Sequence, residues 1–160
     1  MGSTGNLSKT LNFDTISAID NYIQGKGNNF NSNQIKDIKD NMKESNNSLF
    51  RVEDSSWSGD SVKVGDIFTF DKDIKSFTDS QSGIDNVIVE GDDAGLYENN
   101  IVIYKTVGNI SSLDVKQYSK FNSEEDEHFV SGKFKVIKKR RGKKIRGYNT
   151  IVIEIQQLRK

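Results

Sequence analysis

The sequence predicts an α+β domain in which N-terminal helices precede a run of short strands. Apolar residues recur at helical spacing over about residues 7–45. From about residue 48 to 156, short β-branched and aromatic stretches are separated by Gly, Asn and Asp. Helices followed by strands indicate α+β rather than alternating α/β architecture. At 160 residues, the length fits a single domain over residues 1–160.

Two helices are expected in the first third of the chain, and a short one later. The first helix ends at the Gly25–Asn29 break, and its apolar residues are Leu7, Leu11, Ile16, Ile19, Tyr22 and Ile23. The second should run from Ser32 to about Lys43, with Ser32 or Asn33 as its N-cap. The third should cover Ser112–Tyr118, capped by one of the two serines at its start.

Seven strands are expected after the second helix. They are Leu49–Val52, Val62–Phe70, Lys75–Thr78, Asn86–Glu90, Asn99–Val107, Glu127–Ile137 and Tyr148–Gln156.

The composition excludes several classes of site. There is no Cys, which excludes disulfides, a thiolate nucleophile and a zinc–thiolate site. A single His argues against a Ser-His-Asp triad and against a multi-His metal site, so no metal is expected. The 23 basic and 23 acidic residues give zero net charge, which argues against a general polyanion binder. No apolar run is suited to secretion or long enough to span a membrane, so no membrane partner is expected.

An acidic pair at the entrance of a predicted strand is the first candidate site. Glu125 and Glu127 have period-2 spacing, so both carboxylates can emerge on one face of an extended segment. Two neighbouring carboxylates repel each other when ionised, which suggests a function. The alternative is a solvated acidic loop over 124–127. His128 would point to the other face and is taken as incidental, whereas Glu124 would replace Glu125 if the register slips.

Two upstream strands supply further candidates. Arg51 lies between Phe50 and Val52, so it should point away from these apolar neighbours. Its fork of donors suits a phosphate or carboxylate ligand; the alternative is an ordinary strand arginine paired with a surface acid. Ser76 and Thr78 place two hydroxyls on one strand face, where they could orient a carboxylate, although Thr78-Asp79-Ser80 offers the same spacing.

A basic run and a tryptophan complete the candidates. The run Lys138–Arg146 lies between two predicted strands, with Gly142 as a turn residue. It is interpreted as a charged hairpin tip; the alternative is an electrostatic patch for an acidic partner or nucleic acid. Trp57 is a loop aromatic that contacts a ligand, or else a core or lid residue.

In their order along the chain, these elements resemble the Arg…Ser-x-Ser/Thr…Glu-x-Glu signature of mono-ADP-ribosyltransferases. The resemblance covers almost the whole chain: Ala18–Ile23 looks like the early helix of bacterial toxin members, and Ile101–Lys105 like their central strand. Tyr118–Val136 is similar to their target-recognition loop, Glu-x-Glu motif and final hairpin. The closing part also resembles small phage enzymes that modify host RNA polymerase.

There are departures from the pattern. His128-Phe129 replaces the usual aliphatic pair, the usual proline of that strand-turn is absent, and no Ala-x-x-Phe helix is expected after the Ser/Thr strand.

The resemblance implies a mixed β-sandwich of the ADP-ribosyltransferase type, with NAD as a consumed cosubstrate. It implies that Glu127 stabilises the ribose cation, Glu125 prepares an arginine acceptor, Arg51 holds the NAD diphosphate, and Ser76 with Thr78 supports the site. The implied partner is a protein of a host or prey cell, RNA polymerase or another cytosolic protein, rather than nucleic acid. The implied place of action is the host cytoplasm, for a phage-encoded or delivered toxin-like enzyme, with a secreted origin left open. A catalytically inactive binding module and an NAD glycohydrolase are the alternatives.

Overall fold

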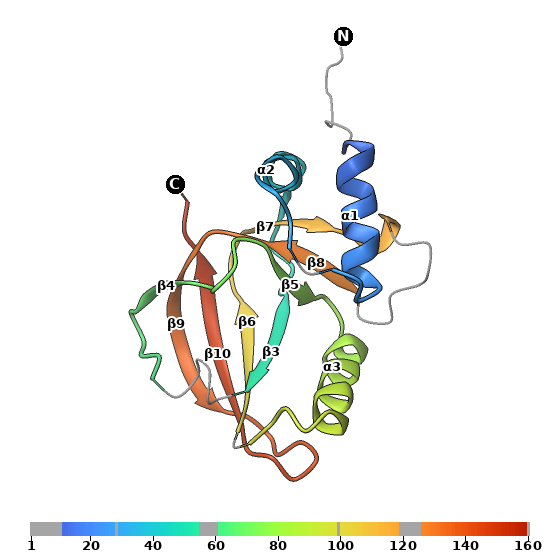
Figure 1. The fold of residues 1–160 in the computed structure, drawn as a ribbon. Coiled ribbons are helices and arrows are strands. Elements are labelled where there is room, and N and C mark those ends of the chain that lie inside the picture. The colour runs from blue at the N-terminus through green and yellow to red at the C-terminus, as the bar shows by residue number, and fades with distance from the viewer. Residues whose placement is uncertain (1–10, 28, 55–60, 99, 119–125, 160) are drawn as a thin grey trace.

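The computed structural model describes residues 11–27, 29–54, 61–98, 100–118 and 126–159. It confirms the predicted α+β class, with helices preceding most of a large mixed sheet (Figure 1). Among these residues, no helix is long and apolar enough to cross a membrane.

Within the described residues, the first two helices are shorter than predicted; Leu11 precedes the first helix, and Leu7 lies outside the described residues. Helix α1 spans Phe13–Ile23 and α2 spans Ser32–Asp40. The N-cap of α2 is Asn31, not Ser32 or Asn33, because its side chain accepts the Gln34 N–H at 2.8 Å while the Gln34 side chain accepts the Asn31 N–H at 3.0 Å. The predicted end at Lys43 is also wrong, since Lys43 begins a short strand.

Helix α3, Gln81–Asp93, replaces the strand predicted at Asn86–Glu90. A helix therefore follows the Ser/Thr strand, although its sequence does not contain the Ala-x-x-Phe pattern. Its N-cap is Ser80, whose Oγ accepts the Gly83 N–H at 2.9 Å. Ile84, Ile88 and Gly91 form its buried face at helical spacing. Gly91 is required there, because a Cβ would collide with the ring of Tyr97.

The strands form a nine-stranded sheet in the order β2-β7-β8-β5-β3-β6-β10-β9-β4. Their bounds are β2 Lys43–Ser45, β3 Phe50–Asp54, β4 Ile67–Thr69, β5 Lys75–Thr78, β6 Ile101–Thr106, β7 Ile110–Asp114, β8 Glu127–Val130, β9 Lys133–Arg141 and β10 Thr150–Gln157. Among the described strands, only β6 and β10 pair in parallel, so the sheet is mixed, as predicted.

Three predicted elements are corrected by this sheet. The helix predicted at Ser112–Tyr118 is strand β7 followed by a single 3-10 turn, Lys116–Tyr118. The single strand Glu127–Ile137 is two strands, β8 and β9, because Gly132 turns the chain at a φ of 102°. The strand predicted over Val62–Phe70 shrinks to β4.

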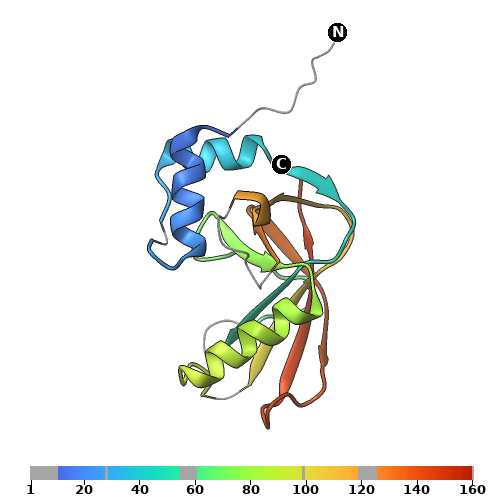
Figure 2. The ribbon, with the colours of Figure 1, turned by 90° about the vertical axis from the view of Figure 1, so that its right-hand side faces the viewer.

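The sheet consists of two halves joined at one residue pair. Strands β3 and β5 pair only through Phe50 and Thr78. The halves fold over a shared core, to which Phe77 and Val130 contribute from one side and Tyr104 and Phe134 from the other. Figure 2 shows α1 and α2 beside the β2-β7-β8-β5 half and α3 beside the other half. This is the sandwich arrangement that the resemblance implied.

Candidate active site

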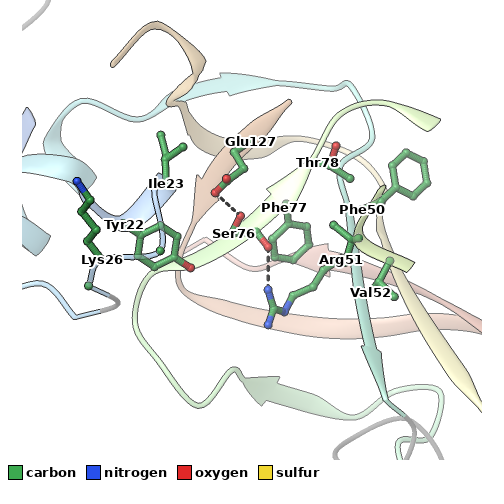
Figure 3. A pocket seen from close by; sticks show the side chains of 13 residues that line it. Tyr22, Ile23, Lys26, Phe50, Arg51, Val52, Ser76, Phe77, Thr78 and Glu127 are labelled. Atoms are coloured by element: carbon green, nitrogen blue, oxygen red, sulfur yellow. Dashed lines mark hydrogen bonds between the residues drawn. The ribbon is translucent and has the colours of Figure 1, made fainter. Parts of the chain in front are cut away.

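A cleft of about 640 Å³ opens where the two halves of the sheet separate. It is lined by the end of α1 and the turn after it, strands β3 and β5, the first residue of β8 and one side chain of α3 (Figure 3). This volume lies in the range of about 300–1,000 Å³ that is typical of small-molecule sites. The splayed strands leave this space because β3 and β5 share one pair of residues only.

The carboxylate of Glu127 lies on the floor of this cleft. Glu127 begins β8 directly opposite Thr78 of β5, so strand alternation puts Ser76, Thr78 and Glu127 on one face. Ser76 Oγ donates to Glu127 Oε2 at 2.8 Å. Glu127 is only 6% exposed, so this hydrogen bond fixes a carboxylate that little water reaches. Of the two possible Ser/Thr pairs, Ser76 with Thr78 or Thr78 with Ser80, the first therefore supplies the hydroxyl that hydrogen-bonds the carboxylate.

Arg51 reaches the same cleft from β3. Its Nη1 donates to the carbonyl oxygen of Ser76 at 2.9 Å, and its Nε donates to Glu53 Oε2 at 2.7 Å. Its Cζ lies 6.0 Å from the centroid of the Phe70 ring. Ser76 thus contacts Arg51 through its carbonyl and Glu127 through its hydroxyl. The pairing with an acid that the alternative interpretation expected is also present, with Glu53 as the partner.

The backbone enters β8 through a left-handed residue. Asp126 has a φ of 49°, a conformation that Asp tolerates better than most residues. Ser80 Oγ donates to Asp126 Oδ2 at 2.6 Å, and the Asp79 N–H donates to the Asp126 carbonyl at 3.3 Å. The N-cap of α3 therefore also holds the residue that precedes Glu127. Sequence reasoning weighed Ser80 only as a possible member of the Ser/Thr motif.

The candidates Glu125 and Trp57 lie outside the described residues, as does Glu124. The position of Glu125 beside Glu127 therefore stays a prediction.

His128 points away from the cleft, as expected from strand alternation. Its Nε2 lies 2.7 Å from Asp79 Oδ2 and its Nδ1 lies 3.2 Å from Ser112 Oγ. Burial alone would raise the pKa of Asp79, but hydrogen bonds from Lys116 and His128 outweigh it, so the pKa of Asp79 lies below its usual value. These contacts tie β5, β7 and β8 together on the side of the sheet opposite Glu127.

The wall formed by the end of α1 was missed by sequence reasoning. Tyr22 and Lys26 line the cleft there, and Gly25 turns the chain at a φ of 74°. Tyr22 is held by ring contacts to Phe30 and Phe129, with centroids 5.5 and 5.1 Å apart. The glycines around Lys26 were interpreted only as a helix break, although a lysine between two glycines after an amphipathic helix is also suited to a ligand contact.

The sequence matches no protein-family model and no curated protein. Solved structures match it at 11–14% identity. The ADP-ribosyltransferase Vis from Vibrio splendidus matches over 93% of this chain and 74% of its own, with a TM-score of 0.63 and 11% identity. The C3 exoenzyme of Clostridium limosum matches over 93% of this chain and 87% of its own, with a TM-score of 0.59 and 12% identity.

The toxin Plx2a from Paenibacillus larvae, also an ADP-ribosyltransferase, matches over 93% and 88%, with a TM-score of 0.56 and 12% identity. A further structure of Vis, in complex with agmatine, matches over 92% and 70%, with a TM-score of 0.56 and 11% identity. The chain therefore has the fold of these ADP-ribosyltransferases.

Proposed function

We propose that the protein is a mono-ADP-ribosyltransferase, which breaks the bond between nicotinamide and ribose in NAD and transfers ADP-ribose to an arginine of another protein. The observation that carries this proposal is the chain of contacts from Arg51 through Ser76 to Glu127 across the cleft. The fold supports it, since the similar structures are ADP-ribosyltransferases. The complex of Vis with agmatine, a guanidinium compound, supports arginine as the acceptor.

Glu127 would supply the electrostatic part of the reaction. Departure of neutral nicotinamide leaves positive charge on the ribose, as in the oxocarbenium-like state of glycoside cleavage. A carboxylate held by Ser76 Oγ in a poorly hydrated position is preorganised to stabilise that charge. Thr78, which is buried directly opposite Glu127, would help to hold Glu127 in place from the same face of the strand. The bond that breaks is the C–N bond to nicotinamide, and the bond that forms joins the ribose carbon to the acceptor nitrogen, which loses its proton.

Arg51 would bind the diphosphate of NAD. Its contacts to Ser76 and Glu53 fix the plane of the guanidinium, whose remaining donors can form paired bonds to phosphate oxygens.

Arg51→Lys should therefore raise the dissociation constant of NAD about tenfold or more, because an ammonium cannot keep both fixing contacts and a paired phosphate bond. Calorimetric titration with NAD measures this, and Arg141→Lys, at an exposed site on β9, is the control. Equal affinity of the Arg51→Lys and wild-type proteins for NAD would make Arg51 a purely structural residue.

Glu125→Gln should separate transfer from cleavage. If Glu125 removes the proton of the acceptor, the variant loses modification of protein and of agmatine but still releases nicotinamide slowly through Glu127. Both products are measured from one reaction, with Glu124→Gln as the matched control. Equal loss of transfer and nicotinamide release would show that Glu125 acts on NAD itself, and unchanged transfer would remove it from the site.

The ion pair between Arg51 and Glu53 favours a second candidate, a binding module that lacks catalysis. Glu53 lies 2.7 Å from Arg51 Nε and offsets the charge that a diphosphate would meet. Incubation of the protein with NAD labelled in the adenosine part decides between the two. Nicotinamide release with label on protein supports the transferase, release without label indicates an NAD glycohydrolase, and no release leaves the binding module.

The acceptor protein would belong to a host or prey cell and would be modified in its cytoplasm, with RNA polymerase as one candidate. Mass spectrometry of a bacterial lysate treated with the protein and NAD would identify the modified protein and residue.

A further inference from the structure

The β9–β10 hairpin concentrates the positive charge of the chain. Nine of the 23 Lys and Arg residues lie between positions 133 and 146, a stretch without Asp or Glu. The other 146 positions therefore carry 14 basic and 23 acidic residues. A chain with zero net charge is thus strongly divided into a basic hairpin and an acidic remainder.

Strand register places part of this charge on one face of the sheet. Lys135, Lys138 and Arg140 lie opposite Gln156, Glu154 and Val152 of β10, which alternate onto the same side. All three basic residues are exposed. Arg140 Nε lies 3.7 Å from Glu154 Oε2. In the described part of the chain, no acid lies within ion-pair distance of Lys135 or Lys138.

Exposed aliphatic side chains lie among these charges. Ile67 of β4 is directly opposite Lys135 and is 60% exposed. Ile137 lies at the register shift between β9 and β10 and is 39% exposed. We call Lys135, Lys138, Arg140, Ile67 and Ile137 the basic hairpin face. It lies on the β4 and β9 edge of the sheet, whereas α1 and α3, which border the cleft, lie on the other side of the molecule (Figure 1).

The hairpin is also held firmly enough to present this face. Arg146 Nε donates to Asp92 Oδ2 of α3 at 2.7 Å, and the hydroxyl of Tyr148 donates to Asp92 Oδ1 at 2.8 Å. Tyr148 in turn packs against Tyr97, with ring centroids 5.7 Å apart. The loop between the two strands is therefore anchored on the helix, and a partner that binds the face meets a fixed surface.

We propose that the basic hairpin face docks an acidic, leucine- or isoleucine-bearing surface of the acceptor protein, away from the cleft. This rests on the proposed transferase function for the identity of the partner. Complementary charge steers the encounter, and aliphatic contacts at its centre exclude water.

Two features favour a protein over nucleic acid as the partner. Aliphatic side chains gain little from a phosphate backbone, but they match the apolar centre of a protein interface. A long nucleic acid would also extend beyond the hairpin. There it would meet the rest of the protein, which has nine more acidic than basic residues and would repel its phosphates.

Binding of two synthetic peptides and an RNA duplex tests the proposal without NAD. The peptides, of about twenty residues as a typical interface side requires, repeat Glu-Glu-Leu or Glu-Glu-Ser, and the duplex carries similar charge. We expect the leucine peptide to bind most tightly to the wild-type protein by fluorescence anisotropy. Lys135→Glu/Lys138→Glu should raise its dissociation constant about tenfold, and Lys135→Gln/Lys138→Gln should raise it less. Ile67→Ser should weaken binding of the leucine peptide and leave binding of the serine peptide unchanged.

The matched control is Lys36→Glu/Lys43→Glu, which changes the net charge equally on α2 and β2 and should leave peptide binding within about twofold. Tighter binding of RNA than of the leucine peptide, or equal weakening in the control, would overturn the proposal. In a lysate with NAD, Lys135→Glu/Lys138→Glu should lose protein labelling but retain nicotinamide release. If the wild type releases no nicotinamide, the transferase function fails while peptide binding still decides the docking surface.

Discussion

Glu127→Gln lowers the rate of nicotinamide release from NAD by a factor of about a hundred to a thousand, according to the proposed mechanism. The side chain keeps its size and an oxygen that accepts the hydrogen bond from Ser76 Oγ, now 2.8 Å away. What is lost is the negative charge that, in the proposed mechanism, would face the ribose cation. Removal of one preorganised electrostatic group from an active site costs about 3–4 kcal/mol in the barrier.

The measurement is the initial rate of nicotinamide release at saturating NAD, together with a thermal melt of each protein. Glu44→Gln is the matched control, because this residue lies exposed on the edge strand β2. The control should keep the wild-type rate, and both variants should melt as the wild type does. A folded Glu127→Gln protein with a wild-type rate would remove Glu127 from the chemistry and, with it, the central claim about the cleft.

Phe129→Ala is expected to lower the free energy of unfolding by about 3–5 kcal/mol. Phe129 is 0% exposed, and its ring lies against Tyr22 and Phe30, with centroids 5.1 and 5.6 Å away. Truncation leaves a cavity between β8 and the N-terminal helices. Because Tyr22 forms one wall of the cleft, activity should fall together with stability.

Urea denaturation followed by circular dichroism measures the change in unfolding free energy. Phe13→Ala is the control, since Phe13 is 84% exposed and its loss should change stability by no more than about 0.5 kcal/mol. The unfolding free energy of Phe129→Leu should lie between those of Phe129→Ala and the wild type, because leucine fills part of the cavity. Similar stability of the two alanine variants would mean that the N-terminal helices contribute little to the folded domain.

The parts of the fold that local patterns determine were predictable. Strand β5 was predicted with the bounds that the structure shows, because two hydroxyls alternate with an aromatic residue and Asp and Ser follow. Helix α3 was not, since its Val87-Ile88-Val89 run has strong β propensity and its two glycines disfavour a helix. Two signals outweigh this β propensity: the helical spacing of Ile84, Ile88 and Gly91, and the N-cap at Ser80.

The candidate site was predictable in its residue types but not in its geometry. Alternation alone placed Ser76 and Thr78 on one face, but nothing local shows that β8 pairs with β5 and so brings Glu127 opposite Thr78. Strand β7 was mistaken for a helix for the same reason, since its partners β2 and β8 are distant in sequence. The contact of Arg51 with the carbonyl of Ser76 depends on the separation of β3 from β5, which is a tertiary feature.

The limited strand pairing between the two halves of the sheet, one residue pair between β3 and β5, has a thermodynamic consequence. Arg51 belongs to one half and Glu127 to the other, so a ligand that touches both residues contributes its binding free energy to the docking of the halves. Occupancy of the cleft and the rigidity of the joint are then linked, and a substitution in the shared core at Tyr104 or Val130, which do not line the cleft, should shift ligand affinity without contacting the ligand. In such a molecule, the affinity of the cleft for its ligand and the stability of the docked sandwich are thermodynamically coupled.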